Sequence, residues 1–394
     1  MRILFTPLGV HTHALSMVPF AWACRAAGHQ VRFAAQPRAA DTLVRAGLSV
    51  AVVGQSYDFQ HNVLRFMRSL TGQGDQADDP APYGPWTESA EVIAPELIRF
   101  ARDWRPDLVV TDPMFYAGPL VAEVLGVPLL RLLWGPDWIM PGCGMGGFAE
   151  DGGQPAPWPD ELVALYESHG ARTAVDFAAA TLDPFPPSLQ LPGLANRVTM
   201  RSVPYNGSDV LPDWTAEPPA RPRICLTWGT STSLYLGEQH FLLPQLLSYL
   251  DGLDVEVVLA ITKADRARMG DLPPHVRVAE NLPLDLFLPS CAVIVNQGGS
   301  AVIASAATHA VPQVVIPLFA DQPTNSRLLA ATGAGIQLDV STMDGEQVRT
   351  AVTAAIHDDE PRAAARRLQA EINSLPTPAE TADSLDEIIA KGSR

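Results

Sequence analysis

The sequence predicts an α/β protein in which two doubly wound domains face each other across a cleft. Short apolar strands alternate with helical segments in both halves of the chain. Runs such as L-V-V and V-P-L-L are apolar at nearly every position, which is typical of parallel strands covered on both faces. A stretch rich in Pro, Gly and Asp separates the halves at residues 206–222. The length of 394 residues also favours two domains over one.

The first half alternates between strands and helices in chain order. Gly28 follows the first expected helix, and glycine often ends a helix because it readily adopts the left-handed conformation. We expect strands at residues 2–7, 30–35, 108–111 and 127–133, and helices at residues 16–27, 94–103 and 117–125.

The second half repeats this scheme after the linker. We expect strands at residues 223–227, 255–261, 276–279, 292–295 and 313–317, with helices between them. Parallel sheets of this kind bind ligands at the carboxyl ends of their strands, so the two binding edges should face a shared cleft.

Composition restricts the classes of partner. The net charge of −16 opposes long-range attraction to nucleic acid or to an anionic membrane. The first apolar run is too short for a signal peptide, and no stretch reaches the roughly 18 apolar residues of a membrane span. Cys24, Cys143, Cys225 and Cys291 are far apart, and three of them lie in apolar stretches, which predicts buried reduced thiols. We therefore expect a cytoplasmic protein.

Residues 293–327 form the most informative segment. An apolar strand leads into a Gly pair at 298–299, a helix of small residues starts near Ser300, and a second apolar strand is followed by Asp321 and Gln322. The free N–H groups and partial positive charge of a helix N-terminus suit a pyrophosphate. The neighbouring carboxylate and amide suit sugar hydroxyls, so the segment predicts a site for a nucleoside diphosphate sugar.

Four further segments resemble one family of enzymes. They are T-H-A-L-S-M-V-P-F-A-W-A-C-R-A-A-G-H-Q-V at residues 12–31, W-R-P-D-L-V-V-T-D-P at 104–113, V-P-Y-N-G-S at 203–208 and L-P-T-P-A-E at 375–380. They are similar to segments of the glycosyltransferases with two Rossmann-like domains, the GT-B fold. Within that fold the chain resembles, nearly end to end, the actinobacterial enzymes that decorate polyketide antibiotics and related natural products.

The resemblance implies a division of roles along the chain. Residues 1–205 would form an acceptor-binding domain and residues 223–374 a nucleotide-sugar-binding domain, with the linker at 206–222. Residues 375–394 would form a C-terminal helix that crosses back to the N-terminal domain.

Two long stretches of the first half, residues 54–86 and 135–159, break the alternation and are expected to be irregular. They contain Trp, Phe, Met and Gly, and two explanations stay open for them: lids or walls of the acceptor site, or variable surface packing.

His13 matches a family histidine that takes the proton of the acceptor hydroxyl as its oxygen attacks the anomeric carbon. An imidazole suits this task because the pKa of histidine lies near neutral pH. Asp112 matches a carboxylate that orients this histidine and stabilises its protonated form. A loop histidine without a catalytic role, and a capping carboxylate before Pro113, stay open as alternatives. His11 and His13 also resemble the H-x-H of metal hydrolases, which would need further ligands at successive strand ends of one barrel.

The resemblance also implies a donor site in the second half. Its expected residues are Thr230, Ser231, Gln297, Gly298, Gly299 and Ser300 for the diphosphate, Leu282 for the base, and Asp321 and Gln322 for the sugar.

Three positions depart from the family pattern. Gln297 stands where relatives usually carry a histidine, and a glutamine can donate a hydrogen bond to phosphate but carries no charge. Asn281 stands where many relatives have a tryptophan that stacks on the base. Ser305 stands where users of uridine donors often have a ribose-binding glutamate. This favours a thymidine donor, although the need for a small buried residue explains Ser305 equally well.

The resemblance implies an inverting, metal-independent hexosyl transfer without a cofactor. A deoxysugar would pass from a nucleotide co-substrate, with TDP favoured, to a polyketide-type aglycone. A homodimer or a helper protein is left open as a further partner. The main alternative is a non-catalytic homologue that binds sugar nucleotide or partners an active glycosyltransferase. A dinucleotide oxidoreductase is disfavoured because G-V-H-T-H-A at residues 9–14 replaces the G-x-G-x-x-G expected after the first strand.

Overall fold

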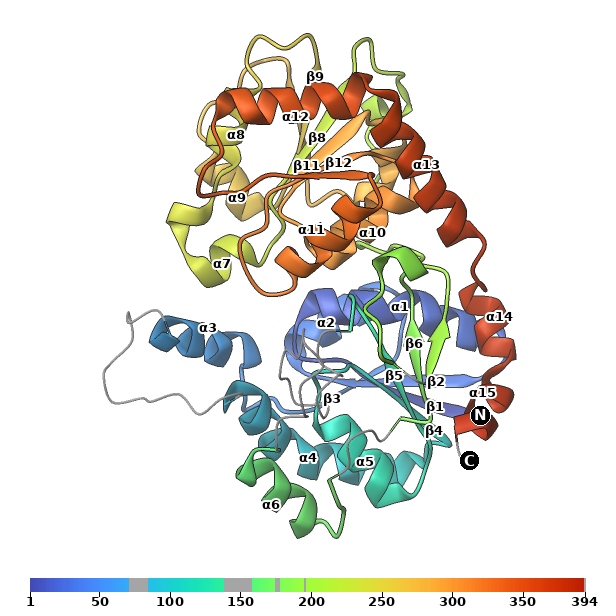
Figure 1. Ribbon diagram of the computed structural model, residues 1–394. Helices are drawn as coiled ribbons and strands as arrows, with labels where there is room; N and C mark the ends of the chain where they lie inside the picture. Colours follow the sequence, from blue (N-terminus) through green and yellow to red (C-terminus); the bar gives the residue numbers. More distant parts are fainter. Residues whose placement is uncertain (71–83, 138–157, 174–177, 195, 393–394) are drawn as a thin grey trace. The chain divides into compact units, whose positions relative to one another are not determined.

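The chain folds into two compact units, each built on one parallel sheet, which confirms the predicted α/β class (Figure 1). The computed structural model describes residues 1–70, 84–137, 158–173, 178–194 and 196–392. The first unit comprises Met1–Pro184, Leu191–Met200 and Pro376–Arg394, and the second comprises Phe185–Gln190 and Arg201–Leu375. Within the described ranges, no helix has the length and apolar character needed to cross a bilayer.

The sheet of the first unit has seven strands in the order β3-β2-β1-β4-β5-β6-β7. They are β1 (Arg2–Thr6), β2 (Gln30–Ala35), β3 (Val50–Val52), β4 (Leu108–Thr111), β5 (Leu129–Leu132), β6 (Ala180–Asp183) and β7 (Arg197–Thr199). The helices are α1 (His11–Ala26), α2 (Pro37–Arg45), α3 (Phe59–Leu70), α4 (Gly84–Trp104), α5 (Ala117–Leu125), α6 (Asp160–Ser168), α14 (Pro378–Asp383) and α15 (Leu385–Gly392).

The strand order of the first sheet reverses between β1 and β4. The chain runs outward from β1 through β2 to β3 and then places β4 on the other side of β1. Helices α1 and α2 accordingly pack together on one face, and α4 and α5 pack together on the other (Figure 1). The loops after β1 and β4 therefore lie at the switch point, where open parallel sheets bind ligands.

The sheet of the second unit has six strands in the order β10-β9-β8-β11-β12-β13, and its switch point lies between β8 and β11. The strands are β8 (Arg223–Thr227), β9 (Glu256–Ile261), β10 (Val276–Glu280), β11 (Val293–Asn296), β12 (Gln313–Val315) and β13 (Gly335–Gln337). The helices are α7 (Thr232–Leu236), α8 (Leu243–Tyr249), α9 (Lys263–Arg268), α10 (Ser300–Thr308), α11 (Gln322–Ala331), α12 (Gly345–His357) and α13 (Asp359–Asn373). Short 3-10 helices occur at Pro187–Leu189, Asp213–Ala216, Glu238–His240, Leu284–Leu286 and Leu288–Ser290.

A short segment between β6 and β7 of the first sheet belongs to the second unit. Phe185 and Leu189 are 4% and 2% exposed in a cluster with side chains of α10, α11 and α13. Ser188 donates to the Glu371 carboxylate from its backbone N and from Oγ, at 3.0 and 2.6 Å. Nothing in the periodicity of residues 185–190 pointed to this placement.

Every strand that the alternation predicted is present, with ends that differ by at most two residues. Two helices begin earlier than predicted, α1 at His11 rather than at residue 16 and α4 at Gly84 rather than at residue 94, whereas α5 has the predicted bounds. The expectation that residues 54–86 are irregular was wrong over α3, which buries Phe59 and Val63, and over residues 84–86, which begin α4. Residues 71–83 and 138–157 of the two irregular stretches lie outside the described residues.

The cysteines within the described ranges are free thiols, as predicted. Cys24 and Cys225 are buried and Cys291 is half-buried. Burial raises the pKa of the Cys24 thiol and of the Cys291 thiol to about 12, so both stay protonated at neutral pH. Cys143 lies outside the described residues.

The switch point of the first sheet tolerates no side chain at Gly118 on α5. A Cβ added there would lie 2.0 Å from Thr111 Oγ1 and 2.9 Å from Thr6 Oγ1. These hydroxyls are buried and bonded to each other at 3.0 Å. We expect Gly118→Ala to lower the free energy of unfolding by about 2–3 kcal/mol, an overpacking cost that thermal denaturation will measure.

The matched control is Gly84→Ala, because the nearest atom to a Cβ at that helical position is 4.0 Å away. A Gly118→Ala protein as stable as the Gly84→Ala protein would contradict the packing described here.

Candidate functional site

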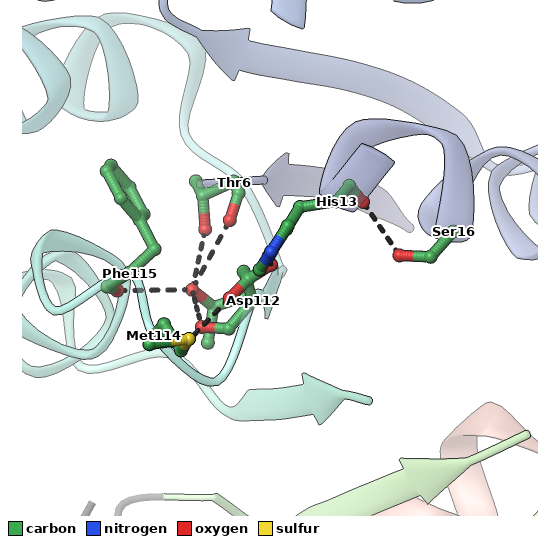
Figure 2. A network of polar contacts seen from close by, with 7 residues as sticks. Thr6, His13, Ser16, Asp112, Met114 and Phe115 are labelled. Atoms are coloured by element: carbon green, nitrogen blue, oxygen red, sulfur yellow. Dashed lines mark hydrogen bonds and ion pairs between the residues drawn. The ribbon is translucent and has the colours of Figure 1, made fainter. Parts of the chain in front are cut away.

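His13 and Asp112 meet at the switch point of the first sheet (Figure 2). His13 lies in the first turn of α1, which follows β1, and Asp112 directly follows β4. Because β1 and β4 are adjacent parallel strands, their carboxyl ends bring the two side chains together. His13 Nδ1 lies 2.7 Å from Asp112 Oδ2. His13 is thus a helical residue, not a loop histidine.

The Asp112 carboxylate is fixed at both oxygens. Oδ1 accepts a 2.8 Å hydrogen bond from Met114 N, while Oδ2 faces His13. The backbone N of Asp112 donates to Thr6 O at 3.1 Å, which ties the loop to β1. The side chain of Asp112 is fully buried, and that of His13 is 15% exposed. Asp112 therefore shapes the turn after β4, as the capping alternative proposed, and orients the imidazole as well.

A histidine held in this way can act as a base. The carboxylate on Nδ1 selects the tautomer in which Nδ1 carries the proton and Nε2 carries the lone pair. If Nε2 then takes a proton, the imidazolium lies against a buried carboxylate, which stabilises its charge.

Trp134 forms a second contact with His13. The two ring centroids are 4.6 Å apart and the planes are tilted by 49°. The turn that carries Trp134 is closed by a buried ion pair, in which Arg131 Nη2 lies 3.0 Å from both oxygens of Asp137. Sequence reasoning missed this group, although a Trp between Arg and Asp after an apolar strand was a usable signal.

In the second unit, the turn between β11 and α10 has a backbone geometry that requires glycine. Asn296 Oδ1 accepts a 2.7 Å bond from Gly298 N, which bends the chain immediately after β11. Gly298 has φ +90°, and a Cβ there would lie 2.6 Å from Ser326 Oγ, so glycine is required. Gly299 is the N-cap of α10 and has no side chain to cap it. The first N–H groups of α10, which begins at Ser300, are thus available to an anion.

Gln297 joins this turn to the loop after β8. Its side chain lies against Gly229, where a Cβ would be 2.1 Å from Gln297 Nε2. Gln297 is only 5% exposed, and no group among the described residues donates to its Oε1. Of the predicted residues beside Gly229, Thr230 is exposed and Ser231 is half-buried. The structure therefore brings together the two loops that were predicted to contact a diphosphate.

Asp321 is held by the first residue of α10 and by a neighbour on α11. Ser300 Oγ and Asn325 Nδ2 donate to Asp321 Oδ2 at 2.7 and 2.6 Å. Asp321 occupies the N-cap position of α11, but its side chain makes no capping bond. The carboxylate is therefore directed toward α10, and capping does not explain its presence.

Gln322 is 3% exposed and forms hydrogen bonds inside the second unit. Its Oε1 accepts from Leu318 N and Phe319 N at 2.9 and 3.3 Å, and its Nε2 donates to Thr232 Oγ1 at 3.2 Å. It links the loop after β12 to α7. The predicted contact with the sugar would use the second amide hydrogen of Gln322, or it would break one of these three hydrogen bonds.

Leu282, predicted at the base, is 8% exposed and follows Asn281 after β10. Asn281 has φ +53°, and asparagine is one of the few residues that adopt this left-handed conformation at low cost. Ser305 is 1% exposed, and its Oγ accepts a 3.1 Å bond from Asn206 Nδ2. The linker residue Asn206 thus forms a hydrogen bond with the Ser305 hydroxyl, and the sequence did not reveal this contact.

The alternative metal site at His11 and His13 required one barrel with ligands at successive strand ends. The chain instead forms two open sheets. In the described ranges, no group of three or more His, Cys, Asp or Glu side chains is arranged to hold a metal ion.

The chain matches one family of proteins along most of its length. Residues 22–229 match the family described as Erythromycin biosynthesis protein CIII-like, N-terminal domain, and residues 244–388 match the corresponding C-terminal domain. The 10-deoxymethynolide desosaminyltransferase of Streptomyces venezuelae is 35% identical over 100% of this chain and 98% of its own.

Solved structures agree with this match. Spinosyn forosaminyltransferase SpnP is 32% identical and superimposes with a TM-score of 0.81 over 99% of each chain. Spinosyn rhamnosyltransferase SpnG, solved with thymidine diphosphate, is 30% identical with a TM-score of 0.79 over 98% of this chain and 100% of its own. SpnG has also been solved with the spinosyn aglycone.

Proposed function

The chain belongs to the EryCIII-like family of GT-B glycosyltransferases, the actinobacterial enzymes of macrolide and polyketide antibiotic biosynthesis, and on that premise we propose how it transfers a deoxysugar from TDP to a natural-product aglycone. The second unit binds the TDP-sugar and the first unit binds the aglycone. The reaction is an inverting hexosyl transfer in which His13 is the base.

The donor diphosphate binds at the N-terminus of α10. The backbone N–H groups that follow Gly299 donate to its oxygens, with Thr230 and Ser231 on the neighbouring loop and the Gln297 amide between the two loops. Leu282 lies against the base, and Asp321, with Gln322 beside it, contacts the sugar hydroxyls. Because the helix dipole and these neutral donors stabilise the charge that develops on TDP, the step needs no metal ion.

The acceptor reacts at the anomeric carbon on the face opposite the diphosphate. Its hydroxyl oxygen forms the new bond to that carbon while the bond from carbon to the phosphate oxygen breaks, and the electron pair leaves with TDP. His13 Nε2 takes the hydroxyl proton, and Asp112 stabilises the imidazolium. Attack opposite to the leaving group inverts the anomeric configuration.

The buried pair of His13 and Asp112 is the observation that carries this proposal. A 2.7 Å contact at a sheet switch point places an oriented base where such folds bind their substrates. A non-catalytic homologue would have no need of that geometry. Gln297 and Asn281, which depart from the family pattern, are the features that favour such a homologue, although asparagine suits the left-handed backbone at position 281.

Ligand-dependent stability and turnover test the proposal together. We expect TDP to raise the thermal midpoint, by an amount that corresponds to about 2.7 kcal/mol at 100 times its Kd, while NAD and NADP leave it unchanged. With a panel of TDP-deoxysugars, and with 10-deoxymethynolide and the spinosyn aglycone among the acceptors, TDP should be released as glycoside forms. TDP binding without sugar consumption across the panel would favour the non-catalytic homologue, and stabilisation by NAD would favour the oxidoreductase.

A further inference from the structure

Beyond the residues already assigned to the donor site, we infer that Asn325 is a positioning residue that sets the direction of the Asp321 carboxylate toward the donor sugar. This inference rests on the proposed function, because it concerns the same donor site. Asn325 lies on α11, four residues after Asp321, so the two side chains share one face of the helix near its N-terminus.

One amide group of Asn325 joins three parts of the donor site. Its Nδ2 lies 2.9 Å from the carbonyl oxygen of Gly298, 2.9 Å from Ser300 Oγ and 2.6 Å from Asp321 Oδ2. The Gly298 carbonyl belongs to the turn before α10, and Ser300 is the first residue of that helix. The same amide therefore contacts the diphosphate end and the sugar end of the site.

The orientation of this amide is settled by its neighbours. A carbonyl and a carboxylate can only accept hydrogen bonds, so the nitrogen of Asn325 must face them. Asn325 is 3% exposed, and no group among the described residues donates to its Oδ1. A buried carbonyl oxygen without a donor costs stability, so packing alone does not explain an asparagine here.

The Asp321 carboxylate depends on these contacts for its direction. It makes no capping bond to α11, and Ser300 and Asn325 both donate to the same oxygen, Oδ2. Two donors on one oxygen fix the plane of a carboxylate. Loss of the Asn325 amide removes one of these two donors and leaves the Ser300 hydroxyl on Oδ2.

A double-mutant cycle tests this role with the donor and acceptor pair that turns over in the transfer assay. We expect Asn325→Ala to lower kcat/KM for the TDP-deoxysugar about 10-fold, the factor that corresponds to about 1.4 kcal/mol, while the Kd for TDP alone changes less than about 3-fold. In an Asp321→Ala background, Asn325→Ala should cause no further loss, because the group that it orients is gone.

Two further variants separate this role from a general loosening of α11. Thr324→Ala removes the buried hydroxyl on the other side of Asn325 in the same turn of α11, and it should leave both measurements unchanged. Asn325→Asp keeps the shape but replaces the donor by an acceptor, and it should lose kcat/KM at least as strongly as Asn325→Ala. If the Asn325→Ala protein fails to fold, Asn325→Asp takes its place in the double-mutant cycle.

Additive losses in the cycle, or equal losses in TDP affinity and in kcat/KM, would overturn the inference and leave the proposed function standing. A wild-type chain that neither binds TDP nor consumes a TDP-deoxysugar would instead remove the proposed function itself.

Discussion

Replacing His13 with alanine is expected to lower kcat by roughly 10²- to 10⁴-fold, the usual contribution of a positioned general base. The imidazole is the group that Asp112 orients, at 2.7 Å, and alanine leaves Oδ2 of Asp112 without this contact while Oδ1 keeps its bond from Met114 N. The affinity for TDP should stay within about 3-fold of wild type, because the proposed diphosphate site lies in the other unit. Steady-state glycoside formation and calorimetry with TDP measure the two quantities.

His275→Ala is the matched control for this variant. His275 is exposed and directly precedes β10, so it lies at the amino edge of the second sheet, away from the proposed site. It should keep the wild-type kcat. A His13→Ala protein that also kept a kcat near wild type would eliminate the assignment of the base.

Replacing Asp112 with asparagine is expected to lower kcat by about 10²- to 10⁴-fold with little change in shape, up to the roughly 10⁴-fold loss known for an orienting carboxylate in a catalytic triad. The asparagine amide would donate to Nδ1 of His13, which leaves the proton on Nε2, so that this nitrogen can no longer accept one. The buried carboxylate that stabilises the imidazolium would also be missing. Glycoside formation at saturating donor and acceptor measures the loss.

Asp107→Asn provides the control, because Asp107 lies at the opposite end of the same strand. Asp107 immediately precedes β4, whereas Asp112 immediately follows it, and Asp107 is half-exposed beside Arg2. Its replacement should leave kcat unchanged. Equal activity of the Asp107→Asn and Asp112→Asn proteins would mean that the Asp112 carboxylate has no part in proton transfer.

The fold was predictable because its central strands are apolar and buried at nearly every position. Strands such as β1, β8 and β9 have five or six residues, most of them buried. Of the four strands that the sequence did not reveal, β3, β7 and β13 are short, only partly buried and at the sheet edges, and β6 has four residues. Such strands depend on pairing with neighbours far away in the chain, which a local pattern does not record.

The contact between His13 and Asp112 was predictable from their positions after strands, whereas the roles proposed for them came from the resemblance. His13 and Asp112 follow adjacent strands, so the strand order alone brings them together. The contacts of Asn325 and Trp134 depend on how helices and turns pack. Neither the periodicity nor the spacing of the sequence could have predicted these contacts. The link from Asn206 to Ser305 joins positions 99 residues apart, and it became visible only in the folded chain.

A crystal structure with an unreactive TDP-sugar analogue and an aglycone tests the central claim most directly. The diphosphate should bind at the turn from Gly298 to Ser300, and the acceptor hydroxyl should lie within about 3 Å of His13 Nε2 while it faces the anomeric carbon. If both ligands are bound and His13 lies more than about 10 Å from that carbon, the imidazole cannot be the base.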